Sequence, residues 1–242
     1  MPRSLTTRSP NGATNAAPWQ TLADAGVEDP SWAYQNYHEF DRYAAGDWTE
    51  TVTGTGTVAG VAAAGGAIAL TNSAGIADAI YMQHPFASHQ LVAGKDHFFK
   101  FKGQLSDVIN TVFYCGLIAT DTTPLANADS VMFLKATAQA ALVLQATIGG
   151  VTTSVAIPNS TLANATDFEC GFHVTENGDI EAFFNPTTGP NTPAAGSVRG
   201  FSAVLRQPGI TQVLLNLSMG LLNSTAAVHS LTVDYILGVS HR

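Results

Sequence analysis

Charged residues are scarce in this chain, at 12% of its 242 residues. Globular proteins usually carry roughly 25%. The surface must therefore be covered largely by Thr, Ser, Asn, Gln and Gly, while the 45% of hydrophobic residues suffices for a full core. This composition suits an all-β protein whose faces pack against neighbouring molecules, and it suits a plain Thr-rich β domain equally well.

Basic clusters and long apolar runs are also missing. The net charge is −8 and no group of Lys and Arg stands out, which argues against binding of nucleic acid. No stretch of about 18 apolar residues exists, so we expect no membrane-spanning segment. The most apolar region, residues 58–70, is mostly Gly and Ala. The first 18 residues lack the apolar run of a signal peptide, and we expect no export by a signal of the chain's own.

Catalytic and metal-binding motifs are absent. The seven histidines form neither H-x-H nor H-E-x-x-H, and no G-x-S-x-G, P-loop or Rossmann fingerprint occurs. Glu169 has no second acid placed beside it as in the carboxylate pair of a glycosidase, because Asp167 precedes the strand and position 171 is Gly. We predict no enzyme activity, no cofactor and no metal. A calcium site at Asp121 and Asp129 is the alternative to a solvated polar loop.

Two cysteines, Cys115 and Cys170, lie in the apolar segments VFYCGLI and FECGFHV. Neighbouring positions in one sheet are a possible arrangement for them. Buried free thiols are favoured over a disulfide in a reducing compartment, and the sequence leaves their pairing open.

Alternation of apolar and polar residues dominates the chain from Trp48 onward. HFFKFKGQL and DFECGFHV are clear examples, and the second leads through Asn177-Gly178 into another alternating run. Gly149-Gly150 marks a further hairpin turn. About eleven or twelve such strands predict an antiparallel jelly-roll sandwich over residues 48–242, with at most one helical turn near residues 160–164.

The first 47 residues differ from the rest, and we predict an extended N-terminal arm. Residues 1–18 hold few large apolar side chains, which predicts flexibility. Residues 19–47 are acidic and rich in aromatics, and a spacing of three among some of these permits a helical turn. The aromatics either cover their own sandwich or anchor the arm on a neighbouring subunit. The candidate interaction residues are Arg3, Arg8, Trp19, Trp32, Tyr34, Tyr37 and Phe40.

The order of several loose motifs resembles a family of phage capsid decoration (cement) proteins. The motifs are DRYAAGDWT, TGTGTVAG, GGAIALTN and AGIADA, followed by FYCGLIATDTTP, SVMFLK and LTVDYILGV. Over residues 48–239 they look like a laminin-G or concanavalin-like jelly roll. The resemblance implies a structural virion protein that binds the major capsid protein and stabilises the phage head. It supplies no catalytic residues.

This resemblance also implies where the protein acts and with what. The expected location is the capsid surface of the virion, after synthesis in the host cytoplasm. Self-association is expected because so few charges cover the surface poorly in a monomer. A homotrimer is favoured by analogy and a dimer is possible.

A second function shares the same fold. A carbohydrate-binding, lectin-like module of a phage tail fibre or spike stacks sugars on exposed aromatic rings. The candidates for such stacking are Trp32, Trp48, Tyr81 and Tyr114. A jelly-roll glycosidase or lyase is disfavoured by the missing acid pair.

Overall fold

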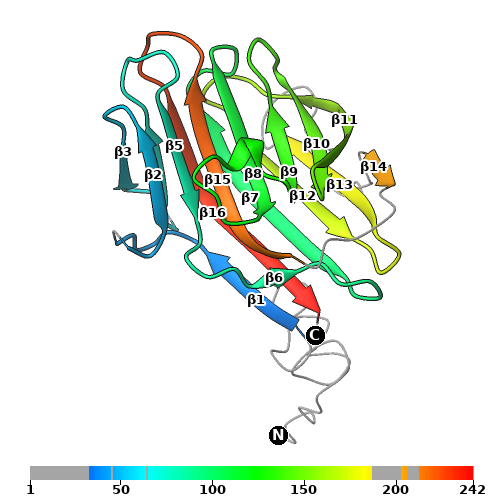
Figure 1. Cartoon of the computed structure of the whole chain (residues 1–242). Coiled ribbons are helices and arrows are strands. Elements are labelled where there is room, and N and C mark those ends of the chain that lie inside the picture. Colours follow the sequence, from blue (N-terminus) through cyan, green and yellow to red (C-terminus); the bar gives the residue numbers. More distant parts are fainter. Residues whose placement is uncertain (1–32, 45, 64, 187–202, 207–212, 242) are drawn as a thin grey trace, which may run out of the picture.

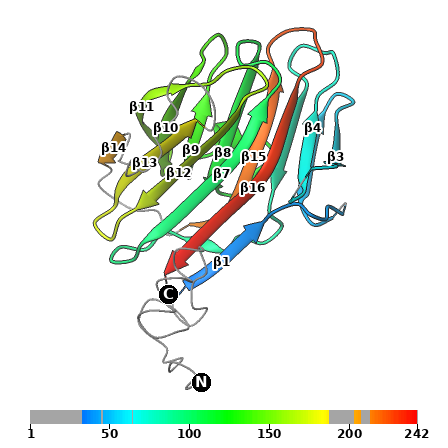
Figure 2. The ribbon, with the colours of Figure 1, turned by 180° about the vertical axis from the view of Figure 1, so that it is seen from behind.

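A computed structural model of the chain describes residues 33–44, 46–63, 65–186, 203–206 and 213–241. Two antiparallel sheets pack face to face (Figure 1). Sheet I, nearer the viewer in Figure 2, has the order β14 (Ala203–Arg206), β13 (Asp179–Pro186), β12 (Asp167–Val174), β7 (His97–Leu105), β16 (Ser230–His241), β4 (Ala67–Thr71) and β3 (Thr57–Val61), with β1 (Ala33–His38) also paired to β16.

Sheet II has the order β11 (Val151–Thr161), β10 (Ala141–Ile148), β9 (Ser130–Lys135), β8 (Thr111–Ile118), β15 (Leu214–Asn223), β5 (Ala79–Gln83) and β2 (Thr49–Thr53), with β6 (His89–Gln90) paired to β15. The predicted all-β jelly-roll sandwich is confirmed. The described residues hold one helix, the 3-10 turn η1 (Pro124–Ala126). The helical turn predicted near residues 160–164 is wrong, because β11 continues to Thr161 and the Leu162 amide donates to the Ala140 carbonyl.

Strand alternation builds the core between the sheets. In β7, Phe99 and Phe101 are buried, while the side chains of Lys100 and Lys102 stay partly exposed. The ring of Phe99 stacks on Phe172 of β12 at 5.0 Å between centroids. Each fully buried aromatic of this kind contributes roughly 1.5–3 kcal/mol through removal of its surface from water. The same alternation aims the lysines at the outer face of sheet I.

The two cysteines face each other across the core. Cys115 belongs to β8 in sheet II and Cys170 to β12 in sheet I, so they are not neighbours within one sheet. Their sulfur atoms are 3.8 Å apart, and both are buried free thiols, the state that the sequence favoured. Burial, reinforced by the neighbouring thiol, raises the pKa of Cys115 well above its usual value.

The end of the predicted arm belongs to the sandwich. Strand β1 pairs antiparallel with β16, from Ala33 opposite His241 to His38 opposite Ile236. Phe40 is only 5% exposed and forms part of the main core. The arm boundary at residue 47 and the helical turn are therefore wrong, because a strand pairs here with the far end of the chain. Residues 1–32, with Arg3, Arg8, Trp19 and Trp32, lie outside the described residues.

Across the described residues, no helix combines the length and the apolar character that crossing a membrane requires.

Candidate functional site

The outer face of sheet I carries a row of side chains from five neighbouring strands. Register places Tyr37 of β1, Leu237 of β16, Lys100 of β7, Gly171 of β12 and Phe183 of β13 opposite one another in turn. Residues opposite one another in antiparallel strands share a face. Figure 2 shows these strands side by side. The row therefore has a position without a side chain at its centre.

Packing explains why that central position is glycine. A Cβ atom on Gly171 would lie 2.7 Å from the carbonyl oxygen of Phe99, so a side chain there would push β7 away. The close packing of β12 on β7 thus requires glycine between Lys100 and Phe183, and Gly171 itself is buried.

Paired charges surround this glycine. The hydroxyl of Tyr235 donates to Oε1 of Glu169 at 3.0 Å, and the ammonium of Lys100 forms an ion pair with the same carboxylate. The Lys100 nitrogen also lies 5.3 Å from the centroid of the Tyr235 ring. Beside them, Lys102 pairs with Asp234. Glu169 is only 8% exposed although it lies on an outer face, which makes its charge-assisted hydrogen bonds strong.

A histidine continues the face toward β13. The ring of His173 stacks on Phe98, with 4.3 Å between centroids and planes 6° apart. Its Nε2 lies 2.8 Å from Oδ1 of Asp96, and its Nδ1 lies 3.2 Å from Oε2 of Glu181. The carboxylates and the stacked ring hold the imidazole in one orientation. Phe98 remains 37% exposed at the surface.

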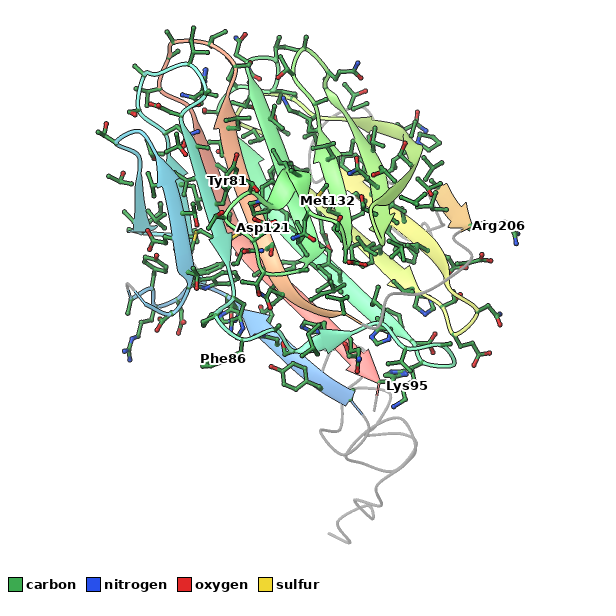
Figure 3. All side chains as sticks on the ribbon, in the orientation of Figure 1. Tyr81, Phe86, Lys95, Asp121, Met132 and Arg206 are labelled. Atoms are coloured by element: carbon green, nitrogen blue, oxygen red, sulfur yellow. The ribbon has the colours of Figure 1, made fainter. Side chains whose placement is uncertain are left out.

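The outer face of sheet II is closed instead. The loop between β8 and β9 lies over it, and Leu125 packs on a second apolar cluster of Tyr114, Ile118 and Met132. Figure 3 shows Tyr81, Asp121 and Met132 on this side of the molecule. Gln83 holds the loop, since its Nε2 donates to the Ala119 carbonyl and its Oε1 accepts from the Asp121 amide.

This arrangement determines which of the rings predicted to stack on sugars are open to a ligand. Tyr114 is 1% exposed and Trp48 belongs to the main core, so neither ring is open to a ligand. Tyr81 is partly buried beside Tyr114, and Trp32 lies outside the described residues. Among the described residues, the exposed aromatic rings are Tyr37 and Phe98 on the outer face of sheet I and Phe86 on the loop between β5 and β6.

The acids of the possible calcium loop have other partners. Oδ1 of Asp121 accepts from the amide and the hydroxyl of Thr123, and these bonds lower the pKa of this carboxyl. Asp129 accepts from the Gly149 amide across the loop. Within the part of the chain that the structure describes, no three His, Cys, Asp or Glu residues are placed to share a metal ion.

The predicted interaction residues separate in space. The ring of Tyr34 points inward and contacts His89 at 5.6 Å, and Phe40 is in the core. Tyr37, at 47% exposed, lies 6.2 Å from Tyr235 and joins the outer face. Sequence reasoning missed the central residues Lys100, Glu169, Tyr235, His173 and Phe98, because their strands are distant in the sequence. The signals in the sequence were the outward lysines of HFFKFKGQL and Glu169, which was considered there only as half of a missing catalytic acid pair.

Comparison with known proteins supports the fold. No protein-family model and no curated protein sequence matches the chain. A Shewanella oneidensis protein of unknown function has a TM-score of 0.58 at 9% identity, covering 93% of this chain and 95% of its own. An endo-β-1,4-glucuronan lyase from Trichoderma reesei has a TM-score of 0.54 at 12% identity, covering 84% and 94%.

Peanut lectin has a TM-score of 0.53 at 10% identity, covering 86% of this chain and 97% of the lectin. The chain therefore has a lectin-like β-sandwich fold. Nothing in these comparisons shows a phage decoration protein, and that resemblance stays a prediction.

Proposed function

We propose that the protein is a carbohydrate-binding module that takes uncharged saccharide chains on the outer face of sheet I. The carrying observation is the cluster on this face in which Lys100 pairs with Glu169 and the Tyr235 hydroxyl donates to the same carboxylate, with the exposed rings of Tyr37 and Phe98 on the same face. Neighbours of the same fold include a lectin and a glucuronan lyase, which supports a saccharide as the ligand class.

The chemistry of the face fits a sugar ring. Pyranose rings present apolar C–H groups on their faces and hydroxyls at their edges, so they stack on aromatic rings and bond to polar groups. Tyr37, Phe98 and Tyr235 offer ring surface. The oriented acids Glu169 and Asp96 accept hydrogen bonds, and charge-assisted bonds of this kind are stronger than neutral ones.

Charge favours a neutral ligand over an anionic one. Both lysines on the face already have an acid partner, Glu169 for Lys100 and Asp234 for Lys102. A uronate carboxylate would have to compete with these acids for the same ammonium groups, and the net charge of −8 would repel it. We infer that uncharged glucans, xylans or galactans bind better than polyglucuronate.

A glycan panel tests this proposal. The full chain is expected to bind at least one neutral polysaccharide and to bind polyglucuronate less well. Replacement of Phe98 by Ala should weaken binding about tenfold, which corresponds to about 1.4 kcal/mol. The matched control is Phe86→Ala, because Phe86 is an exposed phenylalanine on the loop between β5 and β6, and affinity should not change.

Two results would contradict the proposal. One is failure of every neutral glycan in the panel to bind. The other is binding that Phe98→Ala and Tyr37→Ala leave as strong as in the unmodified protein, since the ligand would then lie elsewhere.

A further inference from the structure

Strand β1 covers an end of the sandwich that is lined with histidines. His38 of β1 points inward, 5.2 Å from the ring of His84 and 4.9 Å from Trp48. Two residues before it on the same face, Asn36 is buried, and Tyr34 lies 5.6 Å from His89. His89 and His97, whose rings both contact Ser240 of β16 beside β1, are almost fully buried. The end of the sandwich is thus closed by imidazole rings rather than by aliphatic side chains.

Hydrogen bonds dictate where the protons of two of these rings lie. The Val92 amide donates to Nε2 of His97 at 3.2 Å, so a neutral His97 carries its proton on Nδ1. That proton points to Oγ of Ser240 at 3.0 Å, and the Ser240 hydroxyl can then donate to Nδ1 of His89 at 2.9 Å. The chain of bonds runs in one direction and requires both imidazoles to be neutral.

The far side of His89 has no room for an additional partner. Its Nε2 is buried without a hydrogen-bond partner, and a Cβ atom on Gly238 would lie 2.7 Å from it. Three more buried polar atoms lack a partner, two on β1, Nδ2 of Asn36 and Nε2 of His38, and one beside His89 in the chain, Oγ of Ser88. Burial of these polar atoms without hydrogen-bond partners costs free energy of folding. The cost grows if any of these groups becomes charged.

Added protons would break these contacts. A second proton on His97 would face the Val92 amide, donor against donor. A second proton on His89 would make Ser240 accept from both rings and would leave the Ser240 hydroxyl proton without its acceptor. A proton on His38 would place a charge beside His84 and the Trp48 ring in a mostly buried site. Strand β1 lies at an edge over this site, because it pairs with β16 alone, through six residue pairs.

We propose that mild acid releases strand β1 and the end of β16 from the sandwich, as a built-in latch, before the two sheets separate. The device rests on the histidine pairs under β1 and does not depend on the proposed saccharide binding. Release of β1 removes Tyr37 from the outer face of sheet I.

The groups facing His38 and His89 mostly oppose protonation. For His38, burial is the largest cause and His84 adds to it, while Asp47 acts the other way, and the pKa is lowered from 6.5 to about 4. For His89, burial followed by His97 and His84 also lowers the pKa to about 4.

The surroundings of His97 are mixed. Burial comes first in lowering its pKa to about 4, His241 and Lys95 act in the same direction, and Asp96 opposes them. With β1 in place (the docked state), the pKa values of these three histidines lie below the value of about 6.5 for a free histidine. The state in which β1 has been released (the undocked state) therefore binds more protons between pH 6.5 and pH 4. The docked state therefore loses stability as the pH falls through that window.

Hydrogen exchange of the full chain tests the latch. Amide protection is followed by mass spectrometry from about pH 7.5 to about pH 4.5, with rates corrected for intrinsic exchange. Residues 33–40 and 236–241 should lose protection about tenfold or more as the pH falls, while β8 and β9 in sheet II keep theirs. Retention of β1 protection until β8 also loses protection would overturn the proposal.

Substitutions separate the latch from general acid denaturation. His38→Gln and His89→Gln should each weaken the pH dependence of exchange in β1, because one protonation site under the strand is gone. The control is His229→Gln, a buried histidine next to the opposite end of β16, which should leave that dependence unchanged. His38 is less buried than His89, so its variant keeps the test available if His89→Gln does not fold. A pH dependence in His38→Gln equal to that of the unmodified protein would contradict the latch.

Discussion

Lys135 is a fully buried lysine at the end of β9. Its ammonium donates to the backbone carbonyls of Val108 and Thr111 and to the Thr111 hydroxyl at 3.3 Å. It thereby satisfies the Val108 carbonyl in the turn between β7 and β8 and a carbonyl of Thr111, the first residue of β8. Burial lowers the pKa of Lys135 to about 8, opposed in part by Asp107.

Because the pKa of Lys135 is lowered, we predict that the free energy of unfolding rises in alkaline solution. The folded pKa of about 8 lies below the value of 10.5 in an unfolded chain. Between these values the unfolded chain binds an extra proton, so the free energy of unfolding should increase with pH, by at most about 3 kcal/mol. Urea unfolding of the protein and of Lys135→Met from about pH 7 to about pH 10 measures the difference. Equal pH slopes in the two proteins would contradict this account.

At the scale of elements, local signals were sufficient wherever a strand and its partner are adjacent in the chain. The Asn177-Gly178 turn joins β12 to β13, and Gly178 has the positive φ of 82° that favours glycine there. Gly149 and Gly150 likewise join β10 to β11. Alternation also identified the inward and outward residues of β7.

Pairing across the whole chain was not visible in the sequence. Strand β1 pairs with β16, about 200 residues later, and no local pattern records that register. The spacing of Tyr34, Tyr37 and Phe40 suggested a helical turn. In the strand, that spacing instead turns Tyr34 inward and Tyr37 outward.

Two truncations test the corrected boundary. Removal of residues 1–31 deletes none of the described strands, so the melting temperature should change by less than about 2 °C. Removal of residues 1–40 also deletes β1 and the buried Phe40, and the loss of one core aromatic alone costs about 3–5 kcal/mol. That corresponds to a fall in melting temperature of about 6–20 °C. Phe40→Ala serves as an intermediate control, and equal melting temperatures for the two truncations would show that β1 is not part of the folded unit.

At the scale of the whole molecule, the two outer faces differ in kind. The loop over residues 119–129 closes the face of sheet II, whereas sheet I presents rings and paired charges. The fold class followed from alternation alone. The site did not, because Lys100, Glu169 and Tyr235 meet only when β7, β12 and β16 adopt their register.

The resemblance to decoration proteins carries expectations that remain predictions. Attachment to a major capsid protein, a homotrimer and a place on the virion surface are tested by co-purification with phage heads and by light scattering. Neither outcome bears on the saccharide face, since a decoration protein can also display such a face outward.

The most direct test of the account is a backbone-amide NMR titration of the full chain with a short neutral oligosaccharide from the panel. We predict that shift changes concentrate at Lys100, Glu169, Gly171 and Tyr235, with little change in β8 and β9. Changes confined to sheet II or to the loop over residues 119–129 would contradict the proposed binding face.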